Sequence, residues 1–185
     1  DIKRAIFNTL LKNINNRQII SISGLRRTGK TVLMKQLINH LVESSIKRTN
    51  ILYYSFDEEQ PKIEEIINEF ETLTGFDKNK EKIYIFFDEV QKLENWQNQI
   101  KYYYDNFNIK FFVSGSSSLF IRNDVKESLA GRSFDFYLKP LSFKEFLIFN
   151  KKKELIEKNR LFNQELKREF SLYIKRQFVE TINES

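Results

Sequence analysis

The segment Gly24-Leu25-Arg26-Arg27-Thr28-Gly29-Lys30-Thr31 carries the most constrained pattern in this 185-residue chain. It matches G-x-x-x-x-G-K-[ST] at every fixed position, the pattern of a loop whose backbone N–H groups surround phosphate oxygens. Glycine at the fixed positions allows close backbone approach and dihedrals that a Cβ would forbid. A β-rich run at 17–23 precedes the loop, and apolar residues at helical spacing follow it. Strand, loop and helix in this order are the context that the pattern requires.

The side chains of this loop predict how a nucleoside triphosphate and Mg²⁺ would bind. Lys30 would reach the β- and γ-phosphates, and Thr31 would offer its hydroxyl to Mg²⁺ at the positive end of a helix dipole. The predicted nucleotide-binding residues belong to the loop and the helix start: Gly24, Arg27, Thr28, Gly29, Lys30, Thr31 and Val32. The alternative interpretation is a glycine turn with an incidental lysine.

Length and composition limit the class of protein. A chain of 185 residues fits one domain, or one domain with an appendage. The absence of cysteine excludes disulfide bonds and thiolate metal sites and is compatible with a reducing interior. No run of about 18 apolar residues and no charged-then-apolar leader is present, so we expect a cytoplasmic protein without a membrane anchor. Because the chain starts with Asp1 rather than methionine, we expect it to be a fragment.

The chain is basic and rich in aromatic residues. With 31 basic and 25 acidic residues its net charge is +6, which suits a polyanionic ligand such as a nucleotide or a nucleic acid. Abundant Lys and Asn accompany abundant Ile and Phe, so a biased coding composition explains the charge equally well. The 18 Phe and 8 Tyr residues fall mostly on predicted strands and apolar helix faces, where core packing is their expected role.

The rest of the chain predicts strands and helices in alternation, an α/β fold with a mostly parallel sheet. Apolar runs predict strands at 51–56, 83–89, 109–113 and 134–138. Apolar residues three and four apart predict amphipathic helices at 2–14, 61–75, 93–107 and 119–130. A stripe that recurs every four residues predicts one or two further helices near the end: Phe162, Leu166, Phe170, Ile174, Phe178 and Ile182.

Two acids end one predicted strand, as in the second nucleotide-binding motif, Walker B. Asp88 would hold the Mg²⁺ shell that Thr31 completes. Glu89 would orient and polarise the water that attacks the γ-phosphate, unless it is a surface acid paired with Lys92. One carboxylate of Asp57-Glu58-Glu59 would lie at the same sheet edge, near the metal or its waters; the alternative is a solvated loop.

Hydroxyl groups follow the predicted strand 109–113. Ser114 and Ser116 would read the γ-phosphate or the attacking water at the same edge of the sheet. The alternative is that they cap the following helix, because serine is a favoured N-cap residue.

Five motifs in this order resemble the AAA-like P-loop ATPases of archaea and bacteria that are usually joined to a C-terminal domain of unknown function. They are the loop 24–31, Phe86-Phe87-Asp88-Glu89-Val90-Gln91, Ser114-Gly115-Ser116-Ser117, Leu129-Ala130-Gly131-Arg132 and Pro140-Leu141-Ser142-Phe143-Lys144-Glu145-Phe146. The resemblance covers roughly residues 1–150 and implies a three-layer α/β/α P-loop NTPase fold of the additional-strand, catalytic-glutamate class. It implies that the serine-tipped strand lies between the Walker A and Walker B strands, and that Ser114 or Ser116 is a polar sensor.

The resemblance also implies roles for arginines and for the tail. Arg132 would contact the γ-phosphate, within the chain or from a neighbouring subunit; the alternative is an ion pair that fixes the turn into the last strand. Arg26 and Arg27 match the family loop, although a solvent-facing or domain-contacting role is their alternative. Because the family has a longer C-terminal region, residues 1–150 would form the ATPase domain and 151–185 a helical tail that begins a truncated region. That tail would pack back on the domain, or mediate self-association or binding of a partner protein.

These residues predict an ATPase whose hydrolysis of Mg²⁺-ATP switches contacts with another subunit or domain. ATP and ADP are the expected ligands; adenine is preferred to guanine by resemblance, and no guanine-reading Asn-Lys-x-Asp run is present. One alternative is a nucleotide-gated module that binds DNA or a protein with little turnover, which the basic charge motivates. Another is a P-loop kinase for a small molecule, for which no acceptor motif is visible.

Overall fold

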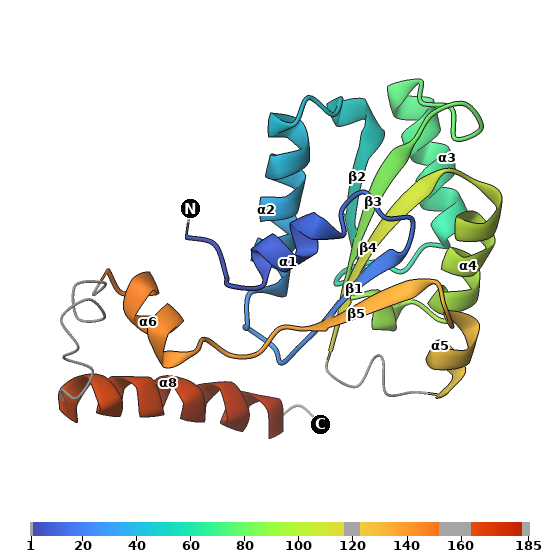
Figure 1. The fold of residues 1–185 in the computed structure, drawn as a ribbon. Coiled ribbons are helices and arrows are strands. Elements are labelled where there is room, and N and C mark those ends of the chain that lie inside the picture. Colours follow the sequence, from blue (N-terminus) through green and yellow to red (C-terminus); the bar gives the residue numbers. More distant parts are fainter. Residues whose placement is uncertain (1, 117–122, 152–163, 183–185) are drawn as a thin grey trace.

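A five-stranded parallel sheet lies at the centre of the computed structural model, which describes residues 2–116, 123–151 and 164–182 (Figure 1). The strands are β1 (Ile19–Ser23), β2 (Ile51–Ser55), β3 (Ile83–Asp88), β4 (Ile109–Gly115) and β5 (Ser133–Tyr137). Their order is β2-β3-β4-β1-β5, and each neighbouring pair is parallel. The predicted α/β fold is confirmed, and β4 lies between the Walker A strand β1 and the Walker B strand β3, as the resemblance implied.

The central strands are apolar on both faces, which is why helices cover both sides of the sheet. In β3, Ile83, Ile85 and Phe87 enter one hydrophobic core, whereas Tyr84 and Phe86 enter the other. This follows from the two-residue period of a strand, because successive side chains point to opposite faces. A sheet buried on both faces reads as a continuous apolar run, and a three-layer α/β/α arrangement results.

The helices divide between the two faces (Figure 1). Helices α1 (Phe7–Lys12) and α2 (Lys30–Glu43) cover one side, and α3 (Ile63–Thr74), α4 (Trp96–Asn106) and α5 (Asn123–Ser128) cover the other. Short 3₁₀ turns, η1 (Arg48–Asn50) and η2 (Val90–Lys92), precede β2 and follow β3. Gly75 ends α3 in the left-handed region at φ 69°, as predicted, and Trp96 is a buried core residue.

Helix α1 is shorter than the prediction of 2–14. The Arg4 side chain donates hydrogen bonds to Thr28 O, Lys139 O and Glu145 Oε1, at 2.8, 2.7 and 2.9 Å. These bonds hold residues 2–4 outside the helix as an arm beside the phosphate loop. Phe7, Leu10 and Ile14 are buried in the core and Ile6 packs against it, in agreement with the predicted apolar stripe, whereas Ile2 is exposed.

Two helices form a third, smaller cluster beside the sheet (Figure 1). Helix α6 (Phe143–Phe149) begins with a capping box in which Ser142 and Glu145 bond each other's backbone N–H groups. Its Phe146 and Leu147 pack with Phe170 and Tyr173 of α8 (Gln164–Ile182). Helix α8 therefore packs against the rest of the chain by its contact with α6.

Part of the predicted tail stripe lies outside the described residues. Phe162 and the side chains of Leu166, Phe178 and Ile182 lie outside the described residues, and the division into a domain at 1–150 and a tail at 151–185 stays a prediction. None of the helices within the described ranges has both the length and the hydrophobicity to cross a bilayer.

Candidate nucleotide-binding site

A cavity of about 650 Å³ opens at the carboxyl edge of the sheet, where the loop 24–31 joins β1 to α2. Because the strands are parallel, the ends of β1, β3 and β4 meet at this edge. The residues that line the cavity come from the loop, the start of α2 and the ends of β2 and β3: Arg26, Arg27, Gly29, Lys30, Thr31, Val32, Asp57 and Glu89. Most of the predicted nucleotide-binding residues are thus adjacent to one space.

The two fixed glycines serve different physical needs. Gly29 precedes α2 with φ 94°, a left-handed conformation that strains any residue with a Cβ, although open space surrounds it. A Cβ on Gly24 would instead lie 2.6 Å from Leu138 O, a backbone atom that cannot easily give way. Gly24 is therefore required by the packing of the loop against the end of β5, a reason that the motif alone did not supply.

Lys30 is buried, with 4% of its side chain exposed, and its ammonium group points back along the loop. Its Nζ donates to Gly24 O and Leu25 O at 3.2 and 3.3 Å. On the other side it lies 3.6 Å from Glu89 Oε1. The lysine thus has one acidic partner and two weak carbonyl partners at the position where phosphates are expected.

Asp88 is almost fully buried at the end of β3 and accepts hydrogen bonds from four donors. Thr31 Oγ1 and the Tyr53 hydroxyl donate to Oδ2 at 2.6 and 3.1 Å. Ser114 Oγ and Glu89 N donate to Oδ1, the latter at 3.2 Å. Burial, and then the charge of Asp88, raise the pKa of Tyr53, so its hydroxyl stays protonated and remains a donor.

Glu89 follows Asp88 with φ 53°, in the left-handed region, and this turn directs its side chain toward the cavity. Its Oε2 accepts a hydrogen bond from Gln91 Nε2 at 2.6 Å, and its Oε1 faces Lys30. The alternative pairing with Lys92 is absent, because Lys92 Nζ lies 2.7 Å from Asp57 Oδ1. The hydrogen bond from Lys92 lowers the pKa of Asp57 despite the partial burial of Asp57. Asp57 also lines the cavity, so it adds one further carboxylate there.

The two candidate sensor serines lie at the end of β4. Ser114 is fully buried, and its hydroxyl donates to Asp88 and accepts from Glu89 N at 3.3 Å. Ser116 is half-buried just beyond the strand. The next described helix is α5. Ser117 and the other residues between Ser116 and α5 lie outside the described residues, so the capping alternative stays a prediction. Ser114 therefore acts in this structure as a partner of the Walker B segment.

Arg132 is not at the cavity, which corrects the predicted contact with a γ-phosphate of its own chain. Its backbone O accepts from Ile19 N at 2.7 Å, so Arg132 lies at the amino edge of the sheet, about 16 Å of strand away from the loop. Its guanidinium pairs with Asp105 at 2.9 and 3.1 Å, the alternative that the sequence left open. A contact with the nucleotide of a neighbouring subunit stays a prediction.

Three functional candidates were missed by sequence reasoning. Tyr53 reaches Asp88 from the middle of β2, and Gln91 holds Glu89 from the quoted Walker B run. Arg4 supports the loop at Thr28 O, although it lies far from it in sequence. Of these three residues, only Gln91 lies in a sequence motif with an expected function, the Walker B run 86–91.

The oxygen atoms of Thr31 and Asp88 fit a Mg²⁺ ion, which prefers hard oxygen ligands and keeps several waters. Within the described ranges, no group of three His, Cys, Asp or Glu side chains forms a separate metal site. Waters and phosphate oxygens would therefore complete the coordination of an ion held by these two residues.

This fold and this loop define the class of the protein as a P-loop NTPase domain. Residues 16–147 match the model of a family described as AAA domain. Since this match covers most of the chain, the chain belongs to that family.

The curated relatives are longer than this chain. A protein of Haemophilus influenzae, named only as uncharacterized, is 34% identical over 128 residues, which are 68% of this chain and 32% of that protein. MJ1544 of Methanocaldococcus jannaschii, also uncharacterized, is 32% identical over 178 residues, which are 94% of this chain and 35% of that protein. The chain spans about one third of the length of the curated relatives it matches.

Solved structures of low sequence identity share the fold. A DNA polymerase III gamma subunit-related protein of Thermotoga maritima aligns with a TM-score of 0.56 at 16% identity, covering 91% of this chain and 56% of that one. A DNA replication initiation factor aligns with a TM-score of 0.54 at 18% identity, covering 97% of this chain and 61% of that one. At such identities the likeness shows the fold alone.

Proposed function

We propose that the chain is a Mg²⁺-dependent ATPase in which Lys30 binds the γ-phosphate and Glu89 activates the attacking water. Lys30, Thr31 and Glu89 line one cavity, and the buried Asp88 accepts a hydrogen bond from Thr31; this convergence carries the proposal. Lys30 Nζ lies 3.6 Å from Glu89 Oε1, and Thr31 Oγ1 lies 2.6 Å from Asp88 Oδ2. A cation, a hydroxyl, a buried acid and a more accessible acid are the groups that phosphoryl transfer to water requires.

Lys30 would exchange one partner for another when nucleotide binds. A γ-phosphate carries more negative charge than the Glu89 carboxylate and would draw the ammonium group away from it. Glu89 Oε1 would then accept a hydrogen bond from water, while Gln91 keeps Oε2 in place. The base would be available only when the cavity holds a nucleotide.

Thr31 and Asp88 would hold the Mg²⁺ ion, which neutralises charge on the β- and γ-phosphates when bound. Tyr53 and Ser114 would keep the Asp88 carboxylate aimed at the ion, because each donates to a different oxygen of it. Without these donors, a buried carboxylate between Thr31 and the strand ends would have several competing orientations.

The nucleoside would extend into a second cavity of about 510 Å³, which shares Arg27 with the first. Phe146, Leu172 and Tyr173 give this second cavity apolar walls, which suit the ring system of a base. The base would therefore lie between the loop and the α6 and α8 cluster.

Arg4 supports the proposed switching of contacts by hydrolysis. Its guanidinium joins Thr28 O of the loop to Glu145 at the start of α6, at 2.8 and 2.9 Å. Helix α6 in turn packs on α8. A shift of the loop on phosphate release would pass through these bonds to α6 and α8, and so to a partner domain or subunit.

Binding and hydrolysis by point variants test the proposal. We expect Lys30→Ala to lose ATP binding, and Glu89→Gln to bind ATP but to hydrolyse it about 10²- to 10³-fold more slowly. Lys47→Ala and Glu43→Gln change exposed residues away from the cavity and should match the parent. If Glu89→Gln hydrolyses ATP as fast as the parent, the assignment of the base fails. Hydrolysis without any acceptor would separate the ATPase from a small-molecule kinase.

The net charge of +6 favours a second candidate, a nucleotide-gated module that binds DNA with little turnover. Its affinity for duplex DNA would fall steeply with salt, because phosphate contacts release counterions. A titration between low and physiological salt measures this slope, and a flat response would rule out phosphate contacts.

A further inference from the structure

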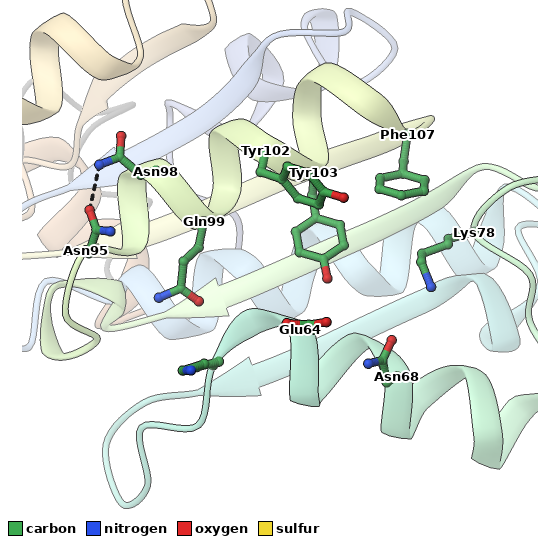
Figure 2. A pocket seen from close by; sticks show the side chains of 10 residues that line it. Glu64, Asn68, Lys78, Asn95, Asn98, Gln99, Tyr102, Tyr103 and Phe107 are labelled. Atoms are coloured by element: carbon green, nitrogen blue, oxygen red, sulfur yellow. Dashed lines mark hydrogen bonds between the residues drawn. The ribbon is translucent and has the colours of Figure 1, made fainter.

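We propose that the groove between α3 and α4 is a docking site for an extended, arginine-bearing segment of a partner protein (Figure 2). The groove encloses about 560 Å³ and shares no lining residue with the nucleotide cavity. It therefore uses surface that the proposed ATPase chemistry does not require.

The shape of the groove suits an extended peptide. Lys62 and Asn95, which precede the two helices, line one end, and Lys78 and Phe107, which follow them, line the other. Helix α4 has 11 residues, so the groove is about 16 Å long and accommodates about five residues of extended chain.

The width of the groove is fixed by a polar contact between its walls. Gln99 of α4 accepts a hydrogen bond from Ile63 N at the start of α3, at 2.9 Å, and donates to Glu94 O at 3.1 Å. An aromatic wall adds rigidity, because the Tyr103 ring stacks on Phe107 at 5.5 Å and meets Tyr102 edge-on at 5.2 Å. The site is thus formed before any ligand arrives, which lowers the entropic cost of binding.

Tyr103 is the residue that points to a ligand. Only 6% of it is exposed, yet its hydroxyl has no hydrogen-bond partner among the described residues. Figure 2 shows this hydroxyl directed into the groove, toward the side of α3 that carries Glu64 and Asn68. Burial, and then the charge of Glu64, raise the pKa of Tyr103 to about 12, so the hydroxyl is a donor at neutral pH. The hydroxyl opens into the groove, and a peptide carbonyl there would accept its hydrogen bond.

The acidic residues of α3 favour a cationic partner. Helix α3 carries four acids and no basic residue, in a protein whose net charge is +6: Glu64, Glu65, Glu69 and Glu71. Lys62 and Lys78 also line the groove, but Lys78 is offset by its ion pair with Glu71 and Lys62 lies at one end, whereas no salt bridge within the described residues involves Glu64. A guanidinium can bond Glu64 with two N–H groups and lie flat on Tyr102, which is 58% exposed. The phosphates of a nucleic acid would instead be repelled by α3.

Peptide binding to matched variants tests this site. The probe is a short fluorescein-labelled peptide of alternating arginine and alanine, with the citrulline analogue and a single-stranded oligonucleotide as comparisons, followed by anisotropy. We expect Glu64→Gln to weaken binding about 5- to 10-fold and Tyr103→Phe about 2- to 5-fold. Glu65→Gln makes the same charge change on the next residue of α3, outside the groove, and should alter binding less than about 2-fold.

Several results would overturn the site. Equal losses of peptide affinity for Glu64→Gln and Glu65→Gln would mean that the peptide is attracted to the acidic surface of α3 in general and not to the groove. Equal affinity of the citrulline peptide, competition by the oligonucleotide, or no saturable binding below about 1 mM would each exclude a groove for arginine. None of these outcomes depends on whether the chain hydrolyses ATP.

Discussion

At the scale of single residues, two neighbouring acids differ in the partners that surround them. Asp88 is buried and accepts from four donors, so its carboxylate has one orientation. Glu89 is 18% exposed and is held by Gln91 on one oxygen and by Lys30 at 3.6 Å on the other. A fixed acid suits a metal shell, and an acid that can release one oxygen suits a water molecule. The roles proposed from the sequence therefore have a physical basis in these contacts.

Tyr53→Phe tests the fixation of Asp88. The variant removes one hydrogen bond to a carboxylate, and we expect the Mg²⁺ concentration for half-maximal hydrolysis to rise several-fold, up to about 10-fold. Binding of ATP without Mg²⁺ should not change. Mg²⁺ titrations of hydrolysis and of nucleotide binding measure both effects. Tyr54→Phe is the control, because the Tyr54 hydroxyl bonds Glu59 O and, among the described residues, nothing at the metal site; equal Mg²⁺ dependence of the two variants would contradict this role.

Gln91→Leu tests the orientation of Glu89. We expect kcat to fall about 10- to 100-fold with KM within about 2-fold of the parent, because the lost hydrogen bond acts on the base and not on the phosphates. Steady-state kinetics measure the split. In the Glu89→Gln background, Gln91→Leu should lower kcat little further, since the two residues act as a unit. If Gln91→Leu lowers kcat as much in the double variant as it does alone, Gln91 does not act through Glu89.

At the scale of elements, the strands were predictable and the arm at residues 2–4 was not. The strand predictions at 51–56, 83–89, 109–113 and 134–138 are confirmed within about two residues, because strands buried on both faces are continuous apolar runs. The partners of Arg4 lie 24, 135 and 141 residues away, and no local pattern marks such a contact. The position of Arg132 could have been predicted from the sequence, because Arg132 lies just before a predicted strand and the residue before a parallel strand lies at the amino edge of the sheet, away from the loop.

Glu145→Gln tests the junction between the arm, α6 and the loop. Burial alone would raise the pKa of Glu145, but the hydrogen bonds from Arg4, Ser142 N and Ala5 N outweigh it and lower the pKa to about 2, from an ordinary 4.5. A lowered pKa means that the carboxylate stabilises the fold above about pH 4.5, and that this stability is lost as the pH falls toward 2.

The parent should therefore exceed the variant by about 1–2 kcal/mol in unfolding free energy at pH 7, and the difference should shrink as the pH approaches 2. Thermal unfolding of both proteins at pH 7, 4.5 and 3 measures it, with Glu127→Gln on the surface of α5 as the control. A difference that is constant with pH would contradict the ionised junction.

At the scale of the whole molecule, the nucleotide site rests on two cores that do not include α8. One core lies between the sheet and α1 and α2, and the other between the sheet and α3, α4 and α5. The cluster of α6 and α8 is separate. The order of motifs predicted the first two cores, whereas the tail pattern predicted a helix but not its partner, since a stripe does not say which surface covers it.

Phe170→Ala tests this independence. Phe170 is half-buried against Phe143 and Phe146, at ring distances of 5.2 and 5.4 Å, so we expect a loss of about 1–2 kcal/mol confined to α6 and α8. Hydrogen exchange should show faster exchange in these helices and unchanged protection in β1, β3 and β4. Loss of protection throughout the sheet would mean that the three clusters unfold as one.

The central claim is that phosphate replaces Glu89 as the partner of Lys30. A crystal structure of the parent protein with Mg²⁺ and a non-hydrolysable ATP analogue tests this most directly. We predict that Lys30 Nζ will lie within about 3 Å of β- and γ-phosphate oxygens, with Thr31 and Asp88 at the Mg²⁺ shell. A nucleotide bound away from the loop 24–31, or Lys30 still bonded to Gly24 O and Leu25 O with no phosphate contact, would contradict the claim.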